Sequence, residues 1–305
     1  MAKTVSDLKK SRLARQKIVD EFGEVPCSVW VASTSESKKV YDDTERQEVQ
    51  RRKELIGKIP EGTMEAFHMS GMSVRGKDGV VSLSKFPLDI LQRALRFYTQ
   101  KGDLVLDPCA GHNSRMQGVY EMERFYIGYD VCHEFMEFNR KIAEKIQKKN
   151  EYDFFKSKVT TITLHEQSSE QMVEQDSSVD FVFTSPPYWD LEYYDDHPGQ
   201  LGYKKTYEEF LAGLGRIGLE CLRVLKPGKF CVFNVNDFRK NGKLYAYHAD
   251  LIRVFLGVGW ELFDIGIMVW SAPPIRSCFA QQVVDTKILG KAHEYLLVFR
   301  KGAAQ

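Results

Sequence analysis

A strand, a turn, a helix and a second strand follow one another in the first half of the chain, and this order constrains the fold most. Residues 102–107 have an apolar centre and lead into the turn Pro108-Cys109-Ala110-Gly111. A helical pattern over residues 114–124 and an apolar segment at residues 125–129 follow, and Asp130 ends that segment. This spacing is typical of the first βαβ unit of a doubly wound nucleotide-binding sheet, in which an acidic residue binds the ribose hydroxyls.

The run Thr184-Ser185-Pro186-Pro187-Tyr188, which directly follows an apolar stretch at residues 181–183, is the second informative feature. Each proline fixes φ and lacks an amide hydrogen, so the loop is rigid and leaves carbonyl oxygens free. A planar amine can donate hydrogen bonds to Ser185 Oγ and the Pro186 carbonyl while its ring lies against Tyr188. Taken alone, the run also fits a tight structural turn that closes a strand.

The rest of the chain continues the alternation of strands and helices. The apolar spacing predicts helices over residues 86–100, 133–150, 207–225 and 245–257. Further strands are expected at residues 159–164, 180–184, 229–235, 263–270 and 295–300, which gives seven with the two described above.

These residues together resemble the DNA amino-methyltransferases, which transfer a methyl group from S-adenosyl-L-methionine to N4 of cytosine or N6 of adenine. The likeness extends from about residue 82 to residue 301, and its motifs occur in an order that builds one sheet. They are Lys85-Phe86-Pro87-Leu88, Asp107-Pro108-Cys109-Ala110-Gly111, Ser178-Val179-Asp180, Thr184 through Tyr188, Gly199-Gln200-Leu201-Gly202, Val224-Leu225-Lys226-Pro227-Gly228 and His293-Glu294-Tyr295. The resemblance implies an α/β fold of the Rossmann-like class I methyltransferase type, with a seven-stranded mixed sheet flanked by helices.

The resemblance also implies the site residues. The expected catalytic residues are Ser185, Pro186, Pro187 and Tyr188. The residues expected to bind S-adenosyl-L-methionine are Phe86, Pro87, Asp107, Pro108, Cys109, Ala110, Gly111, Asn113, Asp130 and Thr184. Trp189, Tyr193 and Arg276 are expected to bind the substrate, although the two aromatic residues also fit the core and Arg276 an ordinary surface loop. No metal site is expected.

The chain departs from the family pattern beside the cofactor. His112-Asn113-Ser114 stand where the family usually has small residues such as Ser-Gly-Thr. Asn113 tolerates a positive φ, whereas His112 can crowd the methionine moiety or add a hydrogen bond to it. This departure affects the expected affinity for the cofactor rather than the fold. After the third strand, Gln167 or Ser168 can replace the family's acidic residue near the adenine, and Glu166 is expected to face water.

Ser185 bears on the target base, because serine at this position is commoner in the cytosine-N4 enzymes and aspartate in the adenine-N6 enzymes. N4 of cytosine is therefore favoured over N6 of adenine. A base inside a duplex cannot reach such a pocket, so the partner is double-stranded DNA with a flipped base, or single-stranded DNA. An RNA amine methyltransferase and a catalytically silent nucleic-acid-binding protein remain alternatives. Cytosine-C5 methylation requires a cysteine nucleophile, and the catalytic loop contains none.

Composition limits the remaining possibilities. A chain of 305 residues that is 43% hydrophobic can form one large core. We expect a methyltransferase domain at residues 81–305 and an N-terminal helical, basic extension and linker at residues 1–80. The 43 basic and 42 acidic residues give a formal net charge of +1, so phosphates must be bound by local patches.

Six cysteines without a Cys-x-x-Cys pair fit a reducing cytoplasm and argue against a disulfide framework. The sequence has neither the apolar core of a secretory signal nor a long uncharged apolar span. We therefore expect a cytoplasmic protein of a bacterial or phage-infected cell, with a role in restriction-modification and no membrane association.

Target recognition is the least specified property of the sequence. Only residues 189–205 and 271–291 are long enough to form a recognition insert. The short length of these segments suggests a short target sequence, a homodimer, or recognition of the target by the N-terminal section. The helix expected near residues 6–22 has a basic face that fits either a DNA backbone or an ordinary solvated surface.

Overall fold

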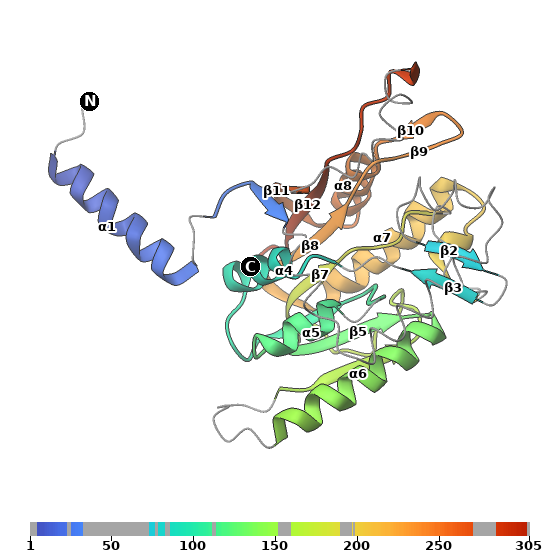
Figure 1. Cartoon of the computed structure of the whole chain (residues 1–305), viewed down its shortest axis with the longest axis horizontal. Helices are drawn as coiled ribbons and strands as arrows, with labels where there is room; N and C mark the ends of the chain where they lie inside the picture. Colours follow the sequence, from blue (N-terminus) through green and yellow to red (C-terminus); the bar gives the residue numbers. More distant parts are fainter. Residues whose placement is uncertain are drawn as a thin grey trace.

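One large sheet forms the centre of the protein in the computed structural model, which describes residues 5–22, 26–32, 73–76, 79–82, 86–111, 114–151, 160–189, 197, 199–270 and 285–303. Its eight strands lie in the order β1-β11-β12-β8-β7-β4-β5-β6 (Figure 1). Their bounds are Val29–Ala32 for β1, Leu104–Asp107 for β4, Phe125–Asp130 for β5, Ile162–Glu166 for β6, Val179–Thr184 for β7, Leu225–Val235 for β8, Glu261–Trp270 for β11 and His293–Arg300 for β12. A separate two-stranded sheet pairs β2 (Ser73–Gly76) with β3 (Gly79–Ser82).

The strand order identifies the fold as a Rossmann-like α/β fold. Strands β6, β5, β4, β7 and β8 are parallel neighbours, and β12 runs antiparallel between β8 and β11. From β4 the chain adds β5 and β6 on one side and then β7 and β8 on the other, so the order reverses between β4 and β7. Folds of this type bind ligands at such a switch point, outside the carboxyl ends of the strands.

The prediction of seven strands is wrong by one, because the short strand β1 joins the sheet beside β11. Trp30 and Ala32 face the core, 8% and 0% exposed, while the alternate residues Val29 and Val31 are exposed. Trp30 Nε1 donates to the Cys27 carbonyl at 2.6 Å. Four residues are too few for a clear sequence pattern, and this strand comes from the predicted N-terminal extension.

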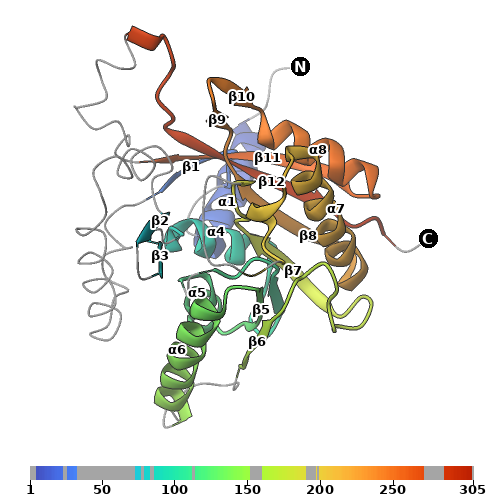
Figure 2. The same ribbon diagram turned by 90° about the vertical axis from the view of Figure 1, so that its right-hand side faces the viewer.

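Helices cover both faces of the sheet (Figure 2). One face packs against α4, α5 and α6, and the other against α7 and α8. Their bounds are Leu88–Tyr98 for α4, Ser114–Glu121 for α5, His133–Glu151 for α6, Tyr207–Val224 for α7 and Tyr247–Gly257 for α8. All five helices lie close to the ranges predicted from apolar spacing. No described helix is both long and apolar enough to cross a membrane.

The N-terminal helix α1 (Val5–Phe22) extends away from the sheet (Figure 1). It contacts α4 through Phe22, whose ring centroid lies 5.8 Å from that of Phe97. Leu13 and Ile18 are 66% and 37% exposed, so the described residues do not bury the apolar side of this helix. The two sequence-based interpretations of its basic face, a DNA contact or a solvated surface, both stay open.

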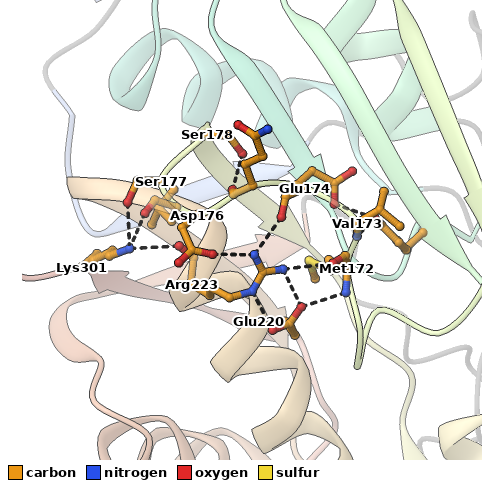
Figure 3. A network of polar contacts seen from close by, with 12 residues as sticks. Met172, Val173, Glu174, Asp176, Ser177, Ser178, Glu220, Arg223 and Lys301 are labelled. Carbon is orange, nitrogen blue, oxygen red and sulfur yellow. Dashed lines mark hydrogen bonds and ion pairs between the residues drawn. The ribbon is translucent and has the colours of Figure 1, made fainter.

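Residues 167–178 connect β6 to β7 without a helix, and a polar network fixes them to the end of α7 (Figure 3). Arg223 donates to the carbonyls of Glu174 at 2.7 Å and Met172 at 3.0 Å. Glu220 accepts from Arg223 at 2.8 Å and from the Met172 amide at 2.8 Å. Lys301 then donates to the Leu225 carbonyl at 2.7 Å, which ties the end of the last described strand to the same corner.

Replacing Arg223 tests this network. Arg223→Leu is expected to lower the free energy of unfolding by about 2–3 kcal/mol, because Glu220 and two backbone carbonyls lose their donor. Arg216 is a matched control, since it pairs with Glu170 of the same segment at 2.7 Å but its side chain is 50% exposed. Arg216→Leu should cost less than about 1 kcal/mol in urea denaturation. Equal losses in the two variants would contradict the role given to Arg223.

Candidate active site

The carboxylate of Asp107 ends β4 and joins four parts of the site. It is 1% exposed. One oxygen accepts from Thr184 Oγ1 at 2.7 Å and from the Cys109 amide at 3.3 Å. The other accepts from Arg115 Nε at 2.6 Å and from the Tyr126 hydroxyl at 3.2 Å. Because these donors surround it, Asp107 fixes the turn after β4 and the loop after β7 relative to each other.

Side chains hold every carbonyl of the turn that follows β4. Ser169 Oγ donates to Pro108 O at 2.7 Å. Arg115 Nη2 donates to Cys109 O at 2.6 Å and Ala110 O at 3.1 Å, and Asn139 Nδ2 donates to Gly111 O at 2.8 Å. The turn is therefore fixed before any ligand binds.

Glycine is required at the end of this turn. Gly111 has a φ of +48°, in the left-handed region that glycine adopts without strain. Its amide donates to Asp130 Oδ2 at 2.7 Å, and the other oxygen of Asp130 accepts from the Cys132 amide at 2.9 Å. The carboxylate at the end of β5 thus lies directly beside the glycine turn, as the sequence predicts. Asn113 lies outside the described residues.

The segment before α4 also reaches the site. The Phe86 ring packs edge-on against Phe183, with centroids 5.2 Å apart, and the Arg115 guanidinium lies 5.8 Å from the Phe86 ring centroid. Pro87 precedes the first residue of α4, where its missing amide hydrogen costs nothing. Phe86 is 8% exposed, so it acts as a packing support for the site.

The loop after β7 is fixed at both ends, and in its middle Ser185 is partly exposed whereas Pro186 is buried. Thr184 is bound to Asp107, and the Pro187 carbonyl accepts from the Tyr247 hydroxyl at 3.4 Å. No described residue forms a hydrogen bond with Ser185 Oγ or the Pro186 carbonyl. The Tyr188 ring packs edge-on against Tyr247, with centroids 5.9 Å apart. The loop therefore presents two hydrogen-bond acceptors beside a partly exposed aromatic ring.

Trp189 has a packing role, in contrast to the prediction that it binds substrate. Its side chain is 7% exposed, and Nε1 donates to the Lys204 carbonyl at 2.9 Å. Its ring centroid lies 5.6 Å from those of Tyr207 and Tyr245. The indole cannot stack on a base without opening this cluster. Tyr193 and Arg276 lie outside the described residues.

Sequence reasoning missed Arg115, which fixes both Asp107 and the turn. Burial lowers the pKa of its guanidinium, but the nearby Asp107 opposes this and the net shift is upward. One sequence signal could have indicated its role: Arg115 is a charged residue at the start of α5. In the structure all residues of this helix from Ser114 to Tyr120 are buried. The partners of Arg115 could not be identified from periodicity, because they lie on a different element.

Glu166 is exposed at the end of β6, as expected, and it also forms ion pairs with α6. Its carboxylate accepts from His133 Nδ1 at 2.7 Å and Arg140 Nη1 at 2.7 Å, so it connects β6 to α6. The hydrogen bond from His133 is the largest cause of a lowered pKa at Glu166. Gln167 Nε2 donates to the Gln171 carbonyl at 3.1 Å.

Cys109 is a neutral packing residue in the cofactor turn. Burial raises the pKa of its thiol, and the charge of Asp107 adds to this. A thiol that stays protonated is a poor nucleophile. This environment agrees with the sequence argument against cytosine-C5 chemistry.

The buried Asn234 pairs with the partly buried Glu294 on the neighbouring strands β8 and β12. Asn234 is 0% exposed, and its Nδ2 donates to Glu294 Oε2. Burial raises the pKa of the Glu294 carboxyl, although hydrogen bonds from Asn234 and Trp270 oppose the shift. Glu294 belongs to the His293-Glu294-Tyr295 motif, which the sequence analysis identified only by its resemblance to the DNA amino-methyltransferases.

Comparison with known proteins identifies the class. The family model for DNA methylases of the N6 and N4 type matches residues 5–145 and 179–305, and the chain belongs to this family. Type II methyltransferase M.MthZI of Methanothermobacter thermautotrophicus is 29% identical over 166 residues, which are 47% of this chain and 45% of that protein. M.MwoI of Methanothermobacter wolfeii, another type II methyltransferase, is 30% identical over 129 residues, 39% of this chain and 19% of that protein.

The alignments therefore span less than half of either curated relative. Among solved structures, a Thermus thermophilus protein assigned as a DNA modification methylase was crystallised with S-adenosyl-L-methionine. It is 30% identical over 44% of this chain and 52% of its own, with a TM-score of 0.33.

Asp107→Asn tests the connection between the two loops. The substitution leaves the buried Arg115 without its counter-charge, so we expect a loss of about 3–5 kcal/mol in the free energy of unfolding. Glu261→Gln is the control, because its pair with Arg300 at 2.7 Å is solvent-exposed and should contribute less than about 1 kcal/mol. A loss at Asp107 no larger than the control would show that its carboxylate does not organise the site.

Glu294→Gln is expected to raise stability in a pH-dependent way. The folded-state pKa of Glu294 lies above the ordinary value of 4.5, so the wild type loses stability as the pH rises from 4.5 through the folded pKa. Glutamine keeps an acceptor for Asn234 and carries no charge. The gain in unfolding free energy should be larger at about pH 7.5 than at about pH 4.5. Equal gains at both pH values would contradict a raised pKa.

Proposed function

We propose that this protein transfers the methyl group of S-adenosyl-L-methionine to an exocyclic amino group of a DNA base, with N4 of cytosine favoured over N6 of adenine. The hydrogen bond of 2.7 Å between Thr184 Oγ1 and Asp107 carries this proposal. It joins the turn after β4 to the loop after β7 at the edge where parallel strands end and their order reverses. Membership of the DNA methylase family supports DNA as the substrate.

The residues around Gly111 fit S-adenosyl-L-methionine. A Cβ at Gly111 would lie 3.9 Å from the Cys109 carbonyl and fill space on the open side of the turn. Ser114 Oγ and Asn139 Oδ1 are buried next to this turn without a hydrogen-bond partner among the described residues. Asp130 offers carboxylate oxygens of the kind that bind ribose hydroxyls. The bound cofactor supplies a methyl group activated by a sulfonium.

The catalytic loop orients the acceptor amine. An exocyclic amine is a poor nucleophile because its lone pair is conjugated with the ring. Hydrogen bonds from its two N–H groups to Ser185 Oγ and the Pro186 carbonyl favour a more tetrahedral nitrogen with an available lone pair. The two prolines keep these acceptors in place, so that the nitrogen is aligned for in-line displacement.

The target base is proposed to leave the duplex, or to be single-stranded, and to stack on Tyr188. Stacking on an aromatic side chain contributes roughly 1–3 kcal/mol, which helps to offset the cost of unstacking. Serine at position 185 supports cytosine over adenine. A homodimer, a cytoplasmic location and a role in restriction-modification stay predictions from the sequence.

Incubation with labelled S-adenosyl-L-methionine and unmodified DNA, followed by nucleoside mass spectrometry, tests activity and the methylated atom together. We expect N4-methylcytosine. Ser185→Ala should lower kcat by about 100-fold or more, because it removes an acceptor of the amine, while binding of the cofactor is unchanged. Asp130→Ala should weaken cofactor binding itself.

Ser178→Ala is the matched control, since Ser178 Oγ bonds to the nearby Gln175 carbonyl at 2.7 Å, at the opposite end of β7 from the loop. If RNA were labelled and DNA were not, the proposal that DNA is the substrate would be wrong. A wild-type protein that binds no cofactor and shows no effect of Ser185→Ala would be a silent scaffold.

A further inference from the structure

A two-stranded hairpin that the sequence analysis did not predict follows β8 at the candidate active site. It consists of β9 (Phe238–Lys240) and β10 (Lys243–Tyr245). Asn241 and Gly242 form the turn with φ values of +50° and +78°, the conformation of the tight hairpin turns that match strand twist. In both ribbon views the hairpin projects past the end of β8, at the opposite end of the molecule from α6 (Figures 1 and 2).

The base of the hairpin packs against the catalytic loop. Phe238 and Tyr245 are cross-strand partners whose rings stack at 5.1 Å. The Phe238 ring lies 6.4 Å from that of Tyr188, and the Tyr245 ring lies 5.6 Å from that of Trp189. These contacts place the hairpin beside Tyr188, which is proposed to stack on the flipped base, and beside Trp189, which packs next to it.

Three of the remaining hairpin side chains are basic. Residues 238–245 include Arg239, Lys240 and Lys243 and no acidic residue. Lys240 and Lys243 are directly opposite each other in the register, an arrangement that destabilises a strand pair by repulsion. Their ammonium groups lie over aromatic rings, 4.2 Å from the Trp189 centroid and 4.9 Å from the Tyr245 centroid. Such contacts orient the cations and offset only part of the repulsion.

Within the described structure, no carboxylate forms an ion pair with Arg239 or Lys243. The nearest acidic residue in the sequence, Asp237, is already bound by His248 at 2.6 Å and lies 3.8 Å from Lys291. Arg239 donates to the Gly242 carbonyl at 3.1 Å, which holds its side chain along the hairpin. Arg239 and Lys243 therefore carry positive charges that no described carboxylate neutralises, and an external anion would reduce the repulsion between them.

We propose that the β9–β10 hairpin binds phosphates of the DNA strand that carries the target base, an inference that rests on the proposed function. The protein has a net charge of only +1, so its affinity for a polyanion must come from local patches of this kind. The contacts with Tyr188 and Trp189 put the basic side chains next to the base site. Phosphate contacts at this position hold the strand in register while the base is bound.

The test compares DNA binding of the wild type with that of the double variant Arg239→Gln/Lys243→Gln. Affinity for a labelled double-stranded oligonucleotide of mixed sequence is measured by fluorescence anisotropy over a series of salt concentrations. Loss of two phosphate contacts should reduce the slope of log affinity against log salt by about 1.8 and weaken binding at least about tenfold at low salt. The double variant Arg239→Lys/Lys243→Arg keeps the charges and should keep the slope.

Lys145→Gln/Lys148→Gln is the matched control, because it removes the same charge from exposed positions on α6. It should leave the slope near that of the wild type, and cofactor affinity should be unchanged in all variants. An unchanged slope in the hairpin variant, or an equal loss in the α6 variant, would overturn the inference. A slope change seen only with RNA would also overturn it.

This measurement requires no methyl transfer, so the two proposals fail in different ways. A wild-type protein that binds DNA through the hairpin but methylates neither cytosine nor adenine would contradict the proposed function alone. A protein that methylates DNA while the hairpin variant keeps the wild-type slope and the wild-type KM for DNA would contradict this inference alone.

Discussion

The buried carboxylate of Asp107 is the constraint on which the candidate site depends. A charge with 1% exposure is stable in a protein interior only when ion pairing and hydrogen bonds replace its hydration. Arg115, Tyr126, Thr184 and the Cys109 amide supply this replacement from α5, β5, β7 and the turn itself. Because one small group satisfies all four, the loops after β4 and β7 have little freedom to move relative to each other.

Aromatic packing fixes the catalytic loop from the opposite side. The prolines remove backbone donors, so the loop cannot be held by a ladder of hydrogen bonds. Instead Trp189 and Tyr188 pack against side chains of α7, α8 and the hairpin, including Tyr207 and Tyr247. The residues that hold the loop are thus different from the two acceptors that remain open on it. The same aromatic cluster connects the loop after β7 to the basic hairpin.

Local patterns allowed much of this structure to be predicted, and their limits explain the errors. The helices and most strands were found because apolar periodicity is a property of neighbouring residues. The strand β1 was missed because four residues give too short a pattern. The Asn241-Gly242 turn is a strong hairpin signal, but the flanking residues are basic and aromatic rather than alternately apolar and polar. The packing partners of Trp189 could not be identified from the sequence, because Tyr207 and Tyr245 are distant along the chain.

The sequence by itself determined the order of the elements, the glycine turn, the proline-rich loop and the family, since each depends on residue types at short spacing. Only the tertiary structure decided what those residues contact. It showed that Asp107 pairs with Arg115, that Trp189 Nε1 is bound by the Lys204 carbonyl, and that Thr184, next to Ser185, is bound to Asp107. Burial and ion pairing depend on contacts between strands and helices from distant parts of the chain. Residue spacing in the sequence does not specify those long-range contacts.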